Sequence, residues 1–412
     1  MSELLQPMTI KHKWMFKARL RSHAFGWRGS RLACQRLKEA VSEIKKVART
    51  DPVTASDGVV SLMERIWPAF QDIDTSSGAL GGAVYWAQQE VLPIAISSPA
   101  DRKTRDRWLE RLWQAIEEDG VDYLSPVGDR WGELCGSLEI ASRWADRFLS
   151  LLRLAWSDPR PGGYVRGINI CLSSLLAAGR HQELLEVLAL RRYPYWHDRE
   201  FGVQALLAEG RVDEALAYAE ASRGLNQPDG AIDATCEKIL LDLGRVDEAY
   251  AKYGLTASRA STGLATFRMI AKKYPGRDPK QFLLDLADSS GESGLWFAAA
   301  KDAGFLDLAL RFASAGRTDV RTLIRASRDL LGKDARFSLQ VGRLAIRRLL
   351  DGYGYELTGL DVISAYRHFM AAAQTLGVAA AARADVLAMV REKPGVFGDL
   401  LVRQCSADPQ KI

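Results

Sequence analysis

The chain has 412 residues, which is enough for two or three compact domains or for one extended stack of helices. It is 47% hydrophobic and 26% charged, so it can bury a large core and has an ordinary charge content. No apolar run approaches the roughly 20 residues needed to cross a bilayer, which excludes a membrane-spanning protein.

The amino terminus and the cysteines indicate the compartment. Lys11 and Lys13 interrupt the chain before an apolar segment develops, so no signal peptide is predicted. The five cysteines are scattered and form no C-x-x-C pair, and we expect reduced, mostly buried thiols. These features together predict a cytoplasmic protein.

Positive charge is concentrated near the amino terminus. The net charge of the whole chain is +5. Residues 11–50 contain twelve Lys and Arg against Glu39 and Glu43, a local net charge of +10. Since residues 1–10 contribute −1, residues 51–412 carry −4. The chain is therefore a mildly acidic body with a basic amino-terminal segment.

Periodic apolar residues predict amphipathic helices throughout the first 160 residues. The first begins near Ser30, a good cap, and ends at Asp51-Pro52. Further helices are predicted over 59–70, 75–89, 104–118 and 131–152. Pro68 should bend or end the second helix, and the third should end before Pro93.

Two prolines and two glycines in residues 159–163 mark the best candidate domain boundary. It would separate an amino-terminal helical domain, residues 1–160, from a repeat domain, residues 161–331. Helices over 335–350, 360–376 and 379–390 would then form a carboxy-terminal cap, residues 332–412. No strand alternation or Asn-Gly hairpin turn is evident, and the predicted fold class is all-α.

A sequence block repeats within the second domain. LLAEGRVDEAL, at 206–216, recurs 34 residues later as LLDLGRVDEAY, at 240–250. Weaker copies are LLAAGRHQELL, at 175–185, and DAGFLDLAL, at 302–310. Periods of 31 to 34 residues are typical of stacked helical hairpins, in which each unit buries its apolar face against its neighbours.

The repeated block has a physical interpretation as a helix–turn–helix. Gly210 and Gly244 should end one helix in a left-handed conformation, which glycine adopts without a Cβ penalty. Asp213 and Glu214 should then lie in the first turn of the next helix, where the helix dipole favours negative charge.

This turn pattern resembles that of tetratricopeptide and related helical repeats, over roughly residues 165–330, although the tryptophan and the paired Gly-Tyr positions of that family are absent. The resemblance implies a right-handed α-solenoid of stacked helical hairpins preceded by the amino-terminal helical domain. The whole chain also resembles a group of uncharacterised bacterial proteins through the stretches AFGWRGSR (24–31), EAVSEIKKVAR (39–49), SSGALGGAV (76–84) and GDRWGELC (128–135). That second resemblance implies a bacterial source and no particular activity.

The basic segment interleaves cations with aromatic rings, as a nucleic-acid groove does, because cations neutralise phosphates and rings stack on bases. A helix lying on anionic lipid shows the same pattern, as does a solvated basic helix packed against the acidic body. The candidate nucleic-acid or anion-binding residues are Lys11, Lys13, Trp14, Lys17, Arg19, Arg21, Trp27, Arg28 and Arg31.

A second polar group of residues could line a pocket. It comprises Asp129, Arg130, Trp131 and Glu133. The alternative is structural: Asp129 would cap a helix whose first turn holds Glu133.

Other motifs give no site. The five histidines form no H-E-x-x-H pattern, and His197-Asp198 is interpreted as part of a solvated turn. The loop at 72–83 lacks the sixth-position glycine and the twelfth-position glutamate of a calcium loop, and no phosphate-binding loop is present. No metal, cofactor or catalytic residue is therefore predicted.

The leading functional hypothesis is a non-enzymatic helical-repeat scaffold or adaptor that binds a protein or peptide partner. The alternative is a nucleic-acid-associated protein that uses the basic, aromatic amino terminus. An enzyme with a pocket near residues 129–133 is the third hypothesis. The sequence leaves the oligomeric state open.

Overall fold

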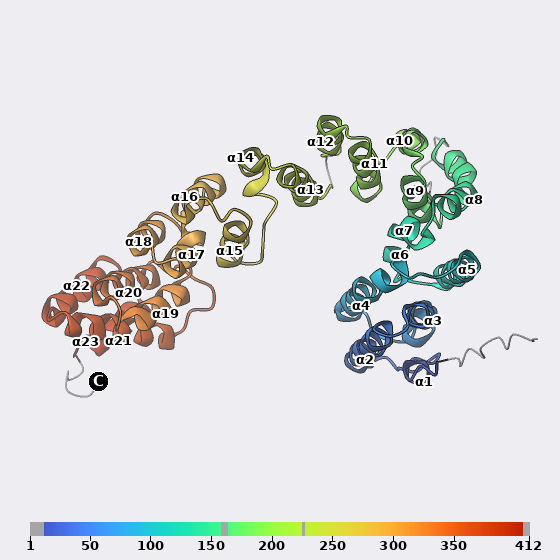
Figure 1. The fold of residues 1–412 in the computed structure, drawn as a ribbon. Coiled ribbons are helices and arrows are strands. Elements are labelled where there is room, and N and C mark those ends of the chain that lie inside the picture. The colour runs from blue at the N-terminus through green and yellow to red at the C-terminus, as the bar shows by residue number, and fades with distance from the viewer. Residues whose placement is uncertain (1–11, 158–163, 225–226, 407–412) are drawn as a thin grey trace, which may run out of the picture. The chain divides into compact units, whose positions relative to one another are not determined.

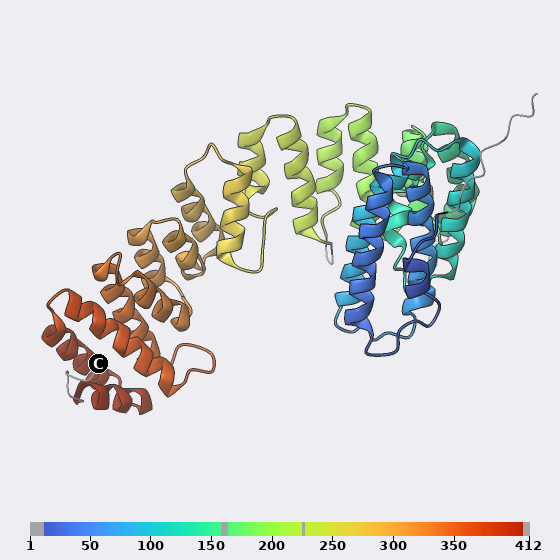
Figure 2. The same cartoon turned by 60° about the horizontal axis from the view of Figure 1, so that its bottom comes forward.

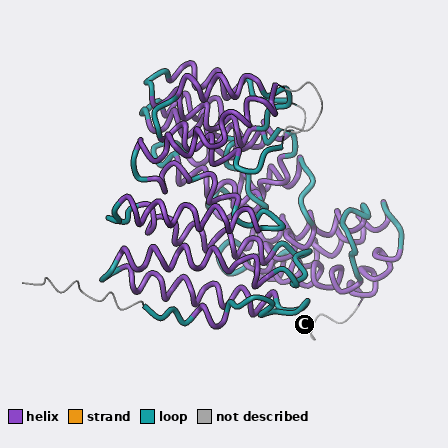
Figure 3. The backbone as a smooth tube through the Cα atoms, turned by 90° about the vertical axis from the view of Figure 1, so that its right-hand side faces the viewer, coloured by secondary structure: helices purple, strands orange, loops and turns teal. Residues whose placement is uncertain are grey.

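The computed structural model describes residues 12–157, 164–224 and 227–406. Within these ranges the chain is all-helical and contains no strand (Figure 3). No described helix combines the length and the apolar composition that crossing a lipid bilayer requires. The chain divides into two compact units, Met1–Pro228 and Asp229–Ile412.

The helices of the first unit pack against their sequence neighbours and against the helix after next. Thus α3 contacts both α4 and α5, and α9 contacts α10 and α11 (Figure 1). The core runs through the unit and includes the fully buried Leu37, Leu62 and Trp131. The helices are α1 Phe16–Arg19, α2 Ser30–Ala48, α3 Pro52–Phe70, α4 Ala79–Ile96, α5 Arg102–Glu118, α6 Ser125–Asp129, α7 Trp131–Cys135, α8 Leu138–Ser157, α9 Ile168–Ala177, α10 His181–Leu190, α11 Trp196–Ala208 and α12 Val212–Glu220.

The second unit follows the same packing rule. Its α20 contacts α21 and α22, and α21 contacts α22 and α23 (Figure 2). Its helices are α13 Asp229–Asp242, α14 Val246–Ala249, the π-helix η1 Tyr250–Gly254, α15 Gly263–Lys273, α16 Pro279–Ser290, the 3-10 helix η2 Ser293–Trp296, α17 Phe297–Asp302, α18 Leu306–Ala315, α19 Val320–Leu330, α20 Ala335–Leu350, α21 Gly359–Thr375, α22 Ala379–Glu392 and α23 Val396–Ser406.

The turn predicted from the repeated block is confirmed. Gly210 and Gly244 have φ angles of 75° and 72° and follow α11 and α13. In the first copy the N–H of Arg211 donates to the carbonyl of Leu206 at 2.9 Å, and the N–H of Gly210 donates to that of Leu207 at 3.0 Å. This pair of bonds is the Schellman motif, which satisfies the last carbonyls of a helix.

An Arg-x-x-Glu pair also recurs at helix starts. In the Arg211–Glu214 pair the guanidinium donates two hydrogen bonds to the carboxylate, at 2.9 and 2.6 Å. The arginine occupies the position just before α12, and the glutamate lies in the first turn. Similar pairs stand at the starts of α10, α14 and α7, as Arg180–Glu183, Arg245–Glu248 and Arg130–Glu133.

Several predicted helix ends were wrong. Asp51 is the cap that starts α3 rather than the stop of α2, since its carboxylate accepts the N–H of Thr54 at 2.9 Å. The third helix was predicted to end before Pro93, but Pro93 lies inside α4, which ends at Ile96. Pro68 also lies inside α3, whose end at Phe70 is the predicted one. The helix predicted over 131–152 is interrupted at Gly136, whose φ is 67°.

The predicted domain boundary at 159–163 lies outside the described residues, and the two compact units divide between Pro228 and Asp229. All five cysteines are reduced thiols outside any disulfide, and Cys135, Cys171 and Cys236 are buried.

Candidate functional site

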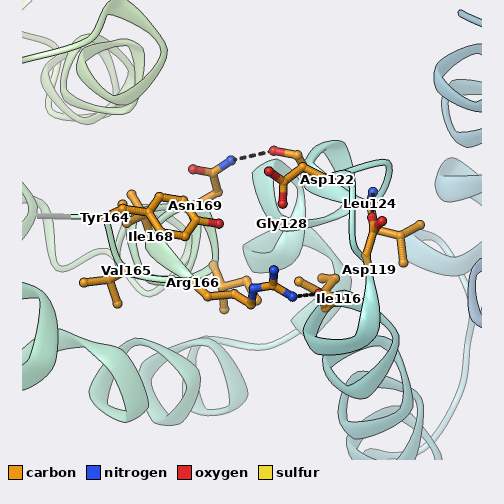
Figure 4. Close-up of a pocket in the computed structure, with 13 residues that line it drawn as sticks. Ile116, Asp119, Asp122, Leu124, Gly128, Tyr164, Val165, Arg166, Ile168 and Asn169 are labelled. Atoms are coloured by element: carbon orange, nitrogen blue, oxygen red, sulfur yellow. Dashed lines mark hydrogen bonds between the residues drawn. The ribbon is translucent and has the colours of Figure 1, made fainter. Parts of the chain in front are cut away.

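A pocket of about 120 Å³ lies in the first unit, beside the end of α5, the short α6 and the segment that leads into α9 (Figure 4). Its apolar floor includes Ile116, Leu124 and Ile168. Polar side chains complete the lining, namely Asp119, Asp122, Ser125, Tyr164, Arg166 and Asn169.

Two of these polar side chains hold the walls in place. The Asp119 side chain is buried, and its carboxylate accepts the N–H groups of Leu124 at 2.8 Å and of Val121 at 3.2 Å. Burial raises the pKa of the Asp119 carboxyl above its ordinary value. Arg166 donates from Nη1 to the carbonyl of Ile116 at 2.8 Å, so it caps the end of α5. Both residues therefore fix the loop that follows α5.

Two lining residues, Asp122 and Arg166, keep hydrogen-bonding atoms that no protein group uses within the described ranges. Asp122 is exposed and has a φ of 58°, and its carboxylate forms no hydrogen bond or ion pair with another side chain within the described ranges. Arg166 makes its hydrogen bonds through Nη1, which leaves Nε and Nη2 available. Figure 4 shows the Asp122 carboxylate and the Arg166 guanidinium on opposite sides of the pocket, with Tyr164 beside Ile168. The pocket therefore offers hydrogen-bond acceptors on one wall and donors on the other.

A cluster of partly exposed polar side chains adjoins the pocket through Asn169. The amide Nδ2 of Asn169 donates to Asp129 at 2.6 Å and lies 3.4 Å from the Ser125 hydroxyl. His197, on α11, contacts the same Asp129 oxygen from its Nε2 at 2.9 Å. The hydrogen bond to Asp129 raises the pKa of the His197 imidazole above its ordinary value. His197 thus lies in a helix and pairs with a carboxylate, so its interpretation as a turn residue was wrong.

The residues predicted to line a pocket at 129–133 do not act together. Arg130 and Glu133 bind each other at the start of α7, as in the repeated blocks. Trp131 is fully buried and lies edge-on to Trp144. Asp129 is the last residue of α6 and pairs with His197, so it does not cap the following helix. Of the four residues, Asp129 alone lies next to the pocket.

The structure also divides the predicted basic segment. Lys11 lies outside the described residues. Trp14 is only 4% exposed and packs against Gly58 of α3, so it cannot stack on a base as predicted. Burial lowers the pKa of the half-buried Lys17, and Arg19 forms an ion pair with Glu39 at 2.5 Å.

The remaining members of that segment are on the surface. Lys13, Arg21, Arg28 and Arg31 are exposed, and Trp27 is 68% exposed. These five residues come from two loops and from the first turn of α2. They remain available to an anionic partner.

No sequence pattern pointed to Asp122, Arg166 or Asn169. They are single polar residues in loops or at a helix start, with no motif around them. Within the described part of the chain, no group of three or more His, Cys, Asp or Glu side chains is arranged to hold a metal ion. No protein family, curated protein or solved structure matches this chain.

Proposed function

We propose that this protein is a non-enzymatic helical-repeat scaffold that binds a peptide segment of a partner protein. In this proposal its helices form a right-handed, tetratricopeptide-like solenoid, and the pocket beside α6 receives a polar group of the peptide. The observation that carries the peptide proposal is the pairing of free acceptors and donors across that pocket.

The regular spacing of ion pairs between helices supports a stacked repeat. Three pairs join α5 to α8, and in each the partners are 37 residues apart: Arg102–Glu139, Asp106–Arg143 and Glu110–Arg147. Equal separations along two helices mean that they run parallel and in register. In the second unit the Arg343–Asp385 and Asp351–Lys393 pairs are both 42 residues apart. Parallel packing of a helix with the one after next, as in α20 and α22, is typical of stacked hairpins, and α5 and α8 are separated only by the short α6 and α7.

The lining of the pocket favours an amide as its ligand. The Asp122 carboxylate is an acceptor only, and the Arg166 guanidinium is a donor only. A group with a donor and an acceptor in one plane satisfies both, and the amide of Asn, Gln or the peptide backbone is such a group. The apolar floor under these residues suits the aliphatic part of the same side chain.

The proposal can be tested by selecting randomised phage-displayed peptides on the full-length protein. We expect enrichment of peptides that share an Asn or Gln, and loss of their binding in Asp122→Gly. Glycine keeps the positive φ of this position, so the variant removes the carboxylate with little cost to the fold. Fluorescence anisotropy of labelled peptides gives the dissociation constants.

Glu356→Gly is the matched control. Glu356 is also an exposed acid with positive φ, at 49°, and lies in the second unit. It should leave peptide binding unchanged. Failure to enrich any peptide family, or equal loss in both variants, would contradict the proposal.

A further inference from the structure

A stripe of cations runs along the whole of α2. Arg31, Lys38, Lys45 and Arg49 are seven, seven and four residues apart, so at 100° per residue they share one face over about 27 Å. All four side chains are exposed. The helix dipole favours the cations near the end of α2, but it disfavours Arg31, which lies in the first turn.

The acidic residues of α2 are turned away from this stripe. Glu39 pairs with Arg19 and Arg36. Glu43 accepts the backbone N–H groups of Met15 and Phe16. The only two acids of α2 are thus occupied on the face that packs against α1, and neither neutralises the cationic stripe.

The stripe borders a groove between α2 and α4 with a volume of about 450 Å³. The two helices pack side by side (Figure 1) and run parallel, because Cys34 lies beside Ala79 and Lys45 beside Glu90, both 45 residues apart. Trp86 of α4 forms part of the wall and is 37% exposed.

Most of the charge in the groove is free to meet a ligand. Lys45 forms an ion pair with Glu90. Lys38, Lys46 and Arg49 also line the groove and have no ion-pair partner among residues 12–157, 164–224 and 227–406. The groove therefore combines a net positive charge with an exposed indole ring.

We propose that this groove binds single-stranded nucleic acid, with phosphates along the α2 stripe and a base stacked on Trp86. The phosphates of a strand bind Lys and Arg side chains spaced along its path, and every base can stack on an aromatic ring. Binding of this kind therefore requires no particular nucleotide sequence. An acidic peptide would use the cations but not the indole, which is why nucleic acid fits better. The site is separate from the peptide pocket beside α6.

The test uses the intact protein and a fluorescein-labelled oligothymidylate long enough to span α2, followed by anisotropy. Four phosphate contacts give a log–log slope against salt near −3, from about −0.7 per phosphate in single strands. Trp86→Ala should weaken binding by about 5- to 150-fold, the range for one lost base stack.

Charge-reversal variants distinguish binding at this groove from a general attraction of the oligonucleotide to the net charge of the protein. Lys38→Glu with Arg49→Glu should abolish binding at about 150 mM salt. The matched control, Lys103→Glu with Arg107→Glu, changes two exposed cations of α5 by the same net charge and should leave binding within about twofold. Circular dichroism confirms that both variants are folded.

Three results would overturn the proposal. The first is equal weakening by the two double variants. The second is unchanged binding in Trp86→Ala. The third is tighter binding to polyglutamate or to phosphatidylserine vesicles than to the oligonucleotide, which would identify an acidic peptide or a membrane as the ligand. Asp122→Gly, which tests the peptide pocket, should bind the oligonucleotide as the wild type does.

Discussion

The close packing of α7 on α9 gives a prediction with a definite sign. A Cβ at Gly132 would lie 2.2 Å from the Ser173 carbonyl oxygen and 2.5 Å from the Ala177 Cβ. Restoring an ordinary contact requires the two helices to separate by about 1 Å, which would also stretch the 2.9 Å hydrogen bond from the Gly132 N–H to the Ser173 hydroxyl. Overpacking of this kind costs about 1–3 kcal/mol, offset by about 0.5–1 kcal/mol because alanine favours a helix over glycine.

Gly82→Ala is the matched comparison, since Gly82 lies inside α4 and an added Cβ meets nothing within 4 Å. We expect Gly132→Ala to lower the free energy of unfolding by about 1–2 kcal/mol and Gly82→Ala to raise it by about 0.5–1 kcal/mol. In a unit of this size, the loss expected for Gly132→Ala corresponds to a fall of about 2–8 °C in Tm, which calorimetry can measure. Equal shifts of the same sign in both variants would refute the steric argument.

Three further predictions follow from local geometry. Gly210→Val should cost about 1–2 kcal/mol through the backbone alone, since no atom lies within 4 Å of the added Cβ, and unchanged thermal melting would contradict this. The pKa of His197, measured by NMR, should exceed 6.5 and should fall in the Asp129→Asn variant. The stability that this pair contributes is complete below about pH 6.5 and is lost as the pH rises through the raised pKa. A wild-type pKa at or below 6.5 would count against the pairing. Burial raises the pKa of Cys171 to about 12, so iodoacetamide at about pH 8 should modify the half-exposed Cys34 first, as mass spectrometry can show.

The all-α composition of the fold and the turns at Gly210 and Gly244 could be predicted because both depend on local signals. Apolar periodicity marked most helices, and Gly210 marked a turn whose φ must be positive. The continuation of α4 beyond Pro93 could not be predicted, because a proline disfavours a helix locally and packing decides whether the helix continues. The start of α7 was missed as a repeat, although its Arg130–Glu133 spacing matches that of Arg211–Glu214.

The candidate sites depend on contacts between distant segments, which a single sequence does not reveal. Asp122 and Arg166 face one pocket but belong to different loops. The burial of Trp14 depends on a glycine in α3 that leaves room for the indole. The basic stripe was visible as composition, but Trp86 joins it only because α4 runs parallel to α2.

The short sequence separation of the contacts has a consequence for synthesis on the ribosome. The inter-helix pairs described above mostly join residues 30 to 45 apart, and even the His197–Asp129 contact spans only 68 residues of 412. Each helix can therefore find its partners soon after the next helices emerge, without waiting for the carboxy terminus. Low contact order of this kind favours rapid folding that proceeds from the amino terminus as translation continues. A ribosome stalled within the second unit would then already carry a folded first unit, with the groove between α2 and α4 complete before the last helices are made.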